Sequence, residues 1–151
     1  MGIIKNFIDE FSKHKMLIYF AILWGISMFF WSLYDLNYYV AEMELLPVIR
    51  NLLALGAGIL LAIFGIKLIN TNFLETMDKE KILVYFLILW AGAFFFTGIH
   101  EILYNGEWMF EYPDHILAFL GAVADLFAGA VLGLFAWNIL NEKEPIATKQ
   151  E

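Results

Sequence analysis

One uninterrupted apolar stretch, residues 81–104, constrains the fold of this chain more than any other feature. Its 24 residues carry charged side chains only at Lys81 and Glu101, near the two ends. An α-helix needs about 20 predominantly apolar residues to cross a hydrocarbon layer of about 30 Å. We therefore predict that this stretch forms a membrane-spanning helix.

Three further stretches have the same character, namely residues 16–36, 47–69 and 115–139. The chain is 62% apolar and 18% aromatic over 151 residues, which exceeds the usual composition of a soluble domain. The sequence therefore predicts an all-α integral membrane protein, folded as a bundle of four transmembrane helices in a lipid bilayer. We expect a multi-pass protein of the cell membrane.

The third predicted span is nearly a second copy of the first. Residues 6–39 and 72–105, which are offset by 66, are identical at 13 of 34 positions. A weaker correspondence, with an offset of 71, relates the second span to the fourth. Internal repeats of this kind indicate tandem structural units. We therefore expect two tandem helical hairpins, at residues 15–70 and 71–140.

The two ends of the chain differ from the spans. Residues 1–14 place isoleucine and phenylalanine side chains three and four positions apart. This spacing favours an amphipathic helix in the membrane interface, and a flexible tail that leads into the first span is the alternative. Residues 141–151 are polar and include Pro145, so we expect them to be disordered.

The basic residues predict the orientation of the spans. Eight of the nine lie before the first span, around residues 67–81 or in the C-terminal tail, and only Arg50 lies near the other side. By the positive-inside rule, the N- and C-termini are both cytoplasmic. Each hairpin then returns the chain to the same side, which makes the repeats parallel and disfavours an inverted-repeat transporter.

Composition also excludes several classes of function. The chain has no cysteine, which excludes disulfides, thiolate metal sites and iron–sulfur clusters. Its net charge is −7 and its basic residues form no patch, so we expect no nucleic-acid partner. The sequence contains no glycine-rich phosphate loop and no nucleophile–base pair. We therefore expect neither enzymatic activity nor a cofactor.

Three charged residues are predicted to meet in the half of the membrane that faces away from the cytoplasm. Counted along their helices, Asp35, Arg50 and Glu101 each lie about 12–13 Å from the centre of their span. The Cα–Cβ bond of Arg50 tilts outward and those of the two acids tilt inward, so the side chains can converge. They form either a structural ion cluster or a transport site.

Asp125 lies near the middle of the fourth span. An ionisable residue at that depth is costly and usually faces a cavity or a partner. Because Gly121, Gly129 and Gly133 share its four-residue spacing, we expect Asp125 to point into the bundle. It is either a cation or proton site, or a neutral acid that is hydrogen-bonded across the bundle.

Two histidines, His100 and His115, lie close to the outer interface, next to Glu101 and Asp114 respectively. Imidazole together with carboxylate can ligate zinc or copper. The alternative is that both histidines are polar residues of an interfacial aromatic belt.

Two functions remain compatible with these patterns. One is a component of a transporter or channel that moves a proton, a cation or a small solute past Asp125 and the Asp35–Arg50–Glu101 group. The other is a non-catalytic accessory or scaffold subunit that packs against a larger membrane complex. Because a 17.4 kDa bundle leaves little room for a pathway, a transporter would work as a homo-oligomer or within a larger complex.

Overall fold

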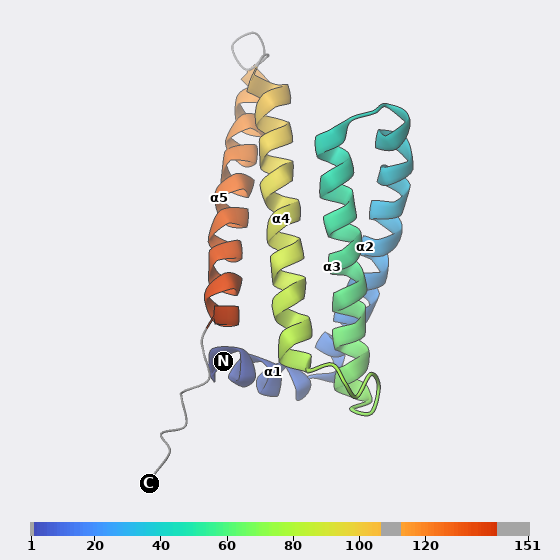
Figure 1. Cartoon of the computed structure of the whole chain (residues 1–151). Coiled ribbons are helices and arrows are strands. Elements are labelled where there is room, and N and C mark those ends of the chain that lie inside the picture. Colours follow the sequence, from blue (N-terminus) through green and yellow to red (C-terminus); the bar gives the residue numbers. More distant parts are fainter. Residues whose placement is uncertain (1, 107–112, 142–151) are drawn as a thin grey trace.

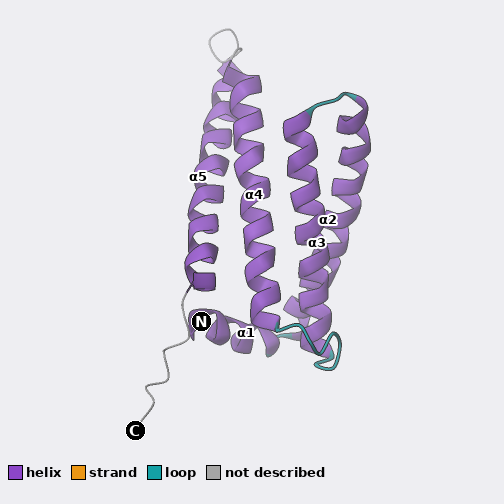
Figure 2. Ribbon diagram, viewed as in Figure 1, coloured by secondary structure: helices purple, strands orange, loops and turns teal. Residues whose placement is uncertain are grey.

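The computed structural model describes residues 2–106 and 113–141. These residues form five α-helices: α1 (Gly2–Ser12), α2 (Lys15–Ala41), α3 (Leu45–Ile69), α4 (Lys79–Gly106) and α5 (Pro113–Asn141). No strand occurs among them (Figure 2). The all-helical prediction is confirmed. The number of helices is five rather than four, because the apolar spacing near the N-terminus produces a short helix of its own.

The four long helices are each long and apolar enough to cross a membrane, and they run side by side (Figure 1). A helix satisfies its backbone hydrogen bonds internally, which a segment inside hydrocarbon requires. The structure is therefore that of a multi-pass membrane protein. The predicted disordered tail lies, apart from its first residue, outside the described residues, and so do residues 107–112 between α4 and α5.

The long helices are arranged as two antiparallel hairpins. Helix α2 packs along α3, α4 packs along α5, and the hairpins meet where α3 packs against α4 (Figure 1). Within the described residues, α5 has no comparable contact with α2 or α3. The helices therefore follow the order α2, α3, α4, α5 in space as well as in sequence.

Glycine allows close approach within both hairpins. A Cβ atom on Gly58 would lie 2.7 Å from the Gly25 carbonyl oxygen and 2.9 Å from the Phe29 nitrogen. A Cβ atom on Gly129 would lie 2.7 Å from the Ala91 carbonyl oxygen and 2.6 Å from the Phe95 nitrogen. Small residues at such crossings let helix backbones approach each other in lipid, where packing drives association.

Helix α1 lies across one end of the long helices, at the end where α3 connects to α4 (Figure 1). We refer to this end as the α1 end, and to the end where α2 connects to α3 as the far end. Ile4 and Ile8 of α1 are buried, and the Phe11 ring lies 6.1 Å from the Phe64 ring of α3. The opposite face of α1 is exposed and polar, except for Ile3 and Phe7.

A buried lysine organises the α3–α4 connection. Lys67 is only 8% exposed, and its Nζ donates hydrogen bonds to the carbonyl oxygens of Phe73 (3.0 Å) and Leu74 (2.8 Å). Leu74 has a positive φ of 49°. The ammonium group thus bonds the Phe73 carbonyl oxygen and shares the Leu74 carbonyl oxygen with the Met77 N–H, which lies 2.9 Å from it.

Candidate functional site

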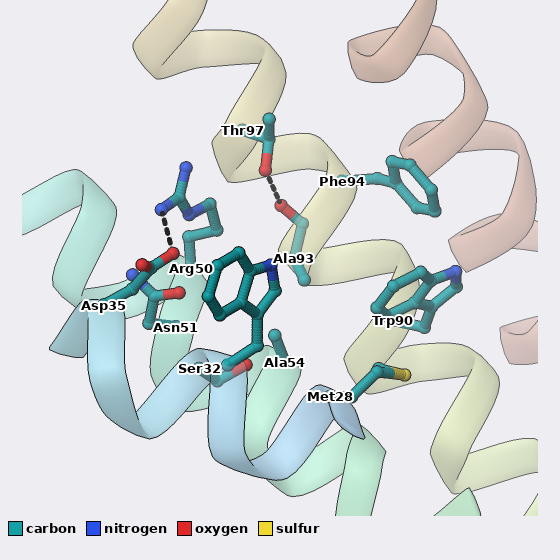
Figure 3. A pocket seen from close by; sticks show the side chains of 11 residues that line it. Met28, Ser32, Asp35, Arg50, Asn51, Ala54, Trp90, Ala93, Phe94 and Thr97 are labelled. Atoms are coloured by element: carbon teal, nitrogen blue, oxygen red, sulfur yellow. Dashed lines mark hydrogen bonds and ion pairs between the residues drawn. The ribbon is translucent and has the colours of Figure 1, made fainter. Parts of the chain in front are cut away.

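An ion pair joins the two helices of the first hairpin near the far end. Arg50 Nη2 of α3 lies 3.6 Å from Asp35 Oδ2 of α2 (Figure 3). The pair forms because the short connection between the helices brings the end of α2 level with the start of α3. The Arg50 side chain is 17% exposed and that of Asp35 is 35% exposed. The guanidinium carbon also lies 5.3 Å from the centre of the Tyr39 ring, a cation–π contact.

This pair lines a pocket of about 250 Å³ between α2, α3 and α4 (Figure 3). Three uncharged polar side chains share the lining: Ser32, Asn51 and Thr97. The apolar part of the lining consists of Met28, Trp31, Ala54, Trp90, Ala93 and Phe94. A cavity that combines two opposite charges, neutral polar groups and aromatic rings can bind a small molecule that carries both charge and apolar surface.

Two of the polar groups are held in place by their own helices. The buried Asn51 donates from Nδ2 to the Pro47 carbonyl oxygen at 2.9 Å. Thr97 donates from Oγ1 to the Ala93 carbonyl oxygen at 2.8 Å (Figure 3). Each side chain uses a donor in this way, so its oxygen atom can still accept a hydrogen bond from a ligand.

Below this pocket, toward the α1 end, lies a second cavity of about 340 Å³. It is lined only by apolar side chains, which come from all five helices: Ile3, Ile4, Phe7, Phe11, Phe20, Ala21, Trp24, Leu61, Phe64, Leu83, Phe86, Leu87 and Phe135. Trp24 of this cavity contacts Trp90 of the pocket of Asp35 and Arg50 edge to face, with ring centroids 5.8 Å apart. The polar lining therefore stops at this pair of indoles.

Glu101 lies beside a histidine. His100 Nδ1 is 3.7 Å from Glu101 Oε1, and His100 Nε2 is 3.5 Å from Glu44 Oε2. The structure thus brings Asp35 and Arg50 together and places Glu101 next to His100. Glu44 is not among the predicted site residues, because it lies between the predicted spans 16–36 and 47–69. Glu44 is the N-cap residue of α3, where a negative charge is favourable, and that position is the signal that could have found it.

His115 lies near the start of α5. Within residues 2–106 and 113–141, no group of three or more histidine, cysteine, aspartate or glutamate side chains is placed to hold a metal ion. The zinc or copper hypothesis for His100 and His115 has no ligand set in this part of the chain. The Asp114 side chain lies outside what the structure describes.

Asp125 is half-buried on α5, away from the pocket of Asp35 and Arg50. Only part of its glycine series lies on the face that packs against α4. Gly129 does so, whereas Gly121 is exposed and has open space where a Cβ would be. Residues four apart drift by about 40° per step around a helix with 3.6 residues per turn. The expectation that the whole series faces the bundle was therefore wrong at Gly121.

Comparison of the chain with protein-family models, with curated proteins and with solved structures found no match. Its function is therefore argued from the pocket and from the placement of its charged side chains.

Proposed function

We propose that this protein is a component of a transporter for a small solute in the cell membrane, and that the solute binds beside Asp35 and Arg50. The observation that carries the proposal is the ion pair in the wall of a pocket between apolar helices. Partly buried charges among membrane-spanning helices are costly and usually serve a substrate or an ion.

The pocket favours a small zwitterion. Arg50 presents a planar donor group that suits a carboxylate, and Asp35 can accept hydrogen bonds from an ammonium group. The pair distance of 3.6 Å is longer than a tight charge-assisted hydrogen bond of about 2.7–2.9 Å, so a ligand can replace the contact at small cost. The volume of 250 Å³ lies below the range of about 300–1,000 Å³ for drug-sized ligands.

The apolar cavity argues against a simple proton or cation channel through one chain. Its lining has no polar side chain, and an ion entering it would lose its hydration without compensation. A solute that leaves the pocket of Asp35 and Arg50 toward the α1 end must pass Trp24 and Trp90. Transport by this route therefore requires the two indoles to separate, as in an alternating-access cycle.

The proposed orientation places the α1 end, and with it both termini, in the cytoplasm, because eight of the nine basic residues lie on that side or in the tail. The pocket then lies in the outer half of the membrane. A cysteine at the exposed position Glu42 should react with a membrane-impermeant maleimide on intact cells, and one at the exposed position Thr76 only after permeabilisation. Reaction at Thr76 on intact cells would reverse the orientation.

We further infer that the hairpins are tandem repeats. At the offset of 66, Gly25 and Phe29 correspond to Ala91 and Phe95. At the offset of 71, Gly58 corresponds to Gly129. The close contacts of Gly58 and of Gly129 are made with these equivalent backbone atoms. Contact between matching residues supports the repeat independently of sequence identity.

The second candidate function, an accessory or scaffold subunit of a larger complex, is favoured by a different observation. Large apolar side chains are exposed along α2 and α5, among them Leu23 (66%) and Phe127 (65%). Faces of this kind can pack against lipid or against a protein partner. The scaffold function predicts that assembly continues when the charged pair is removed.

Binding to the purified protein tests the transport proposal. We would measure the thermal unfolding midpoint with a panel of free amino acids as small zwitterions, and then uptake of any binder into proteoliposomes. Arg50→Leu and Asp35→Asn should each abolish the ligand-induced shift and the uptake, while the matched control Glu42→Gln should retain both. An unaltered response in Arg50→Leu, or no response to any zwitterion in the parent protein, would contradict the proposal.

A further inference from the structure

The two hairpins are covered unequally. Helix α3 packs against α2 on one side and α4 on the other, whereas α5, its counterpart in the repeat, packs closely only against α4 among the described residues. Two contacts mark the α3–α4 interface. A Cβ on Gly56 would lie 3.0 Å from Leu89 Cδ1, and a Cβ on Gly92 would lie 3.0 Å from Leu53 Cδ1.

The residues that correspond to this interface at the repeat offsets lie on exposed surface of α5 and α2. On α5, the positions equivalent to Leu53 and Gly56 are Ala124 and Phe127, and both are exposed. On α2, the positions equivalent to Leu89 and Gly92 are Leu23 and Ile26, and both are exposed as well. Each of these four positions of the α3–α4 interface thus has an uncovered counterpart.

These positions belong to continuous apolar stripes. The α5 stripe consists of Leu117, Leu120, Ala124, Phe127 and Val131. The α2 stripe consists of Tyr19, Leu23, Ile26 and Phe30. Members of each stripe are three or four residues apart and so share one face of their helix. Apart from Ala124, each of these side chains is between 43% and 74% exposed.

Symmetry indicates what covers the stripes. Two parallel repeats in a membrane are related by rotation about the membrane normal. If the two repeats of one chain formed a closed ring, α5 would pack against α2 as α3 packs against α4. No comparable α2–α5 contact occurs in the described part of the chain. Repetition of a head-to-tail interface between copies generates a ring when the rotation between units closes, and a second copy would supply the neighbour that α5 lacks.

We propose that α5 of one chain packs against α2 of a second copy, so that the interface between copies repeats the α3–α4 interface within the chain. The inference rests on the repeat and not on solute transport. At one position along the helices the side-chain sizes suit this interface. Within the chain the large Leu53 packs against the small Gly92, and between copies the small Ala124 would pack against the large Ile26. Phe127 replaces Gly56 at the next level, so the helices stand farther apart there.

The proposed contact completes a second pocket. Asp35 of α2 and Ala54 of α3 line the pocket within the chain, and their repeat counterparts are Glu101 of α4 and Asp125 of α5. The third wall, which Ala93 and Thr97 supply in the first pocket, would come from Ser27 and Trp31 of the second copy. Asp125 then lies in the wall of a pocket between copies and not against lipid.

Cross-linking between differently tagged copies tests the interface, and the absence of natural cysteine makes the background clean. One copy carries Ala124→Cys and the other Ile26→Cys. In native membranes, a short bis-thiol reagent should give a product that contains both tags at twice the chain mass of 17.4 kDa. The depth-matched pair should react at least tenfold more than Ala124→Cys with Leu33→Cys, which lies about 10 Å along the same helix.

Three results would overturn the proposal. Equal yields from the two pairs would indicate random collision, no product would indicate that lipid covers the stripes, and a strong product from Ala124→Cys alone would indicate an α5–α5 contact. A second variant provides an independent readout in lipid nanodiscs. Because Ala124 is exposed in the single chain, Ala124→Trp should leave its fold intact and convert oligomers to single chains. An unchanged oligomer distribution would also contradict the interface.

Discussion

The two hairpins share their packing and differ in their charges. Gly58 and Gly129 approach equivalent backbone atoms across each hairpin. At the position of Arg50, however, the second hairpin has Gly121, and at the position of Ala54 it has Asp125. The first hairpin therefore has an ion pair between Asp35 and Arg50, whereas the second has acids, Glu101 and Asp125, at the positions of Asp35 and Ala54. The difference shows that helix packing tolerates large changes in charge along the same pair of helices.

The segments that precede the hairpins differ as well, although they begin alike. Asn6-Phe7 and Asn72-Phe73 correspond at the sequence offset of 66, yet the first dipeptide lies in α1 and the second in the α3–α4 connection. Lys67 explains the difference, because its ammonium group binds the carbonyl oxygens of the second segment. The N-terminal dipeptide instead lies within helix α1.

The largest expected effect tests whether the packing of the hairpins is equivalent. Gly58→Val and Gly129→Val each add side-chain atoms where a Cβ already meets backbone within 3 Å. Each should lower the free energy of unfolding in detergent by about 2–3 kcal/mol, the usual cost of overpacking. Gly121→Val, with open space around it, is the control and should change little. Unequal losses of unfolding free energy in Gly58→Val and Gly129→Val would show that the two hairpins are not packed equivalently.

The next effect concerns the connection that sets the second hairpin apart. Lys67→Met keeps most of the side-chain volume and removes the donor to two carbonyl oxygens. Losing hydrogen bonds from a charged donor should cost about 2 kcal/mol of unfolding free energy. Lys81→Met, at an exposed position, is the matched control and should stay within about 0.5 kcal/mol of the parent. Equal behaviour of the two variants would show that Lys67 does not hold the turn.

A smaller effect separates the charged groups of the two hairpins. Arg50→Leu leaves Asp35 without its partner and should cost about 1 kcal/mol, between the values for exposed and buried pairs. The cost should shrink when Asp35→Asn and Glu101→Gln are already present, as a double-mutant cycle would measure. Additive losses would mean that Arg50 is not coupled to these acids. Asp125→Asn in the second hairpin should leave the Arg50 coupling unchanged.

The smallest effect lies at the end of α1, where Lys13 Nζ donates a hydrogen bond to Glu10 Oε2 at 2.7 Å on the exposed surface. This hydrogen bond lowers the pKa of Glu10 below its ordinary value of 4.5 and raises the pKa of Lys13 above 10.5. Stabilisation by the pair is fully present between those two values. It is lost as pH falls through the lowered pKa of Glu10 or rises through the raised pKa of Lys13.

An NMR titration of the Glu10 carboxyl group measures this shift. Lys13→Ala should return the pKa of Glu10 toward 4.5, and the unfolding free energy should hardly change, because exposed pairs contribute little. A pKa of Glu10 that is the same in both proteins would show that the contact does not persist in solution.

Much of the fold follows from length and apolar composition, which is why all four spans could be predicted. For residues 1–14 the sequence is compatible with either a helix or a tail, because amphipathic spacing alone does not show what the apolar face packs against. Burial of Ile4 and Ile8 beneath the long helices depends on tertiary structure. Counting along a helix predicts depth in the membrane and says nothing of rotation. The contact between Glu101 and His100 therefore could not be predicted from the sequence.

The edge-to-face contact of Trp24 and Trp90 has an optical consequence. Two indoles held at a fixed angle and close distance couple their electronic transitions, so the pair should produce a circular dichroism signal in the near ultraviolet that neither ring gives alone. One ring comes from each hairpin, and the pair separates the polar from the apolar cavity. The chain thus contains an intrinsic spectroscopic reporter of whether its halves are docked, readable without any attached label.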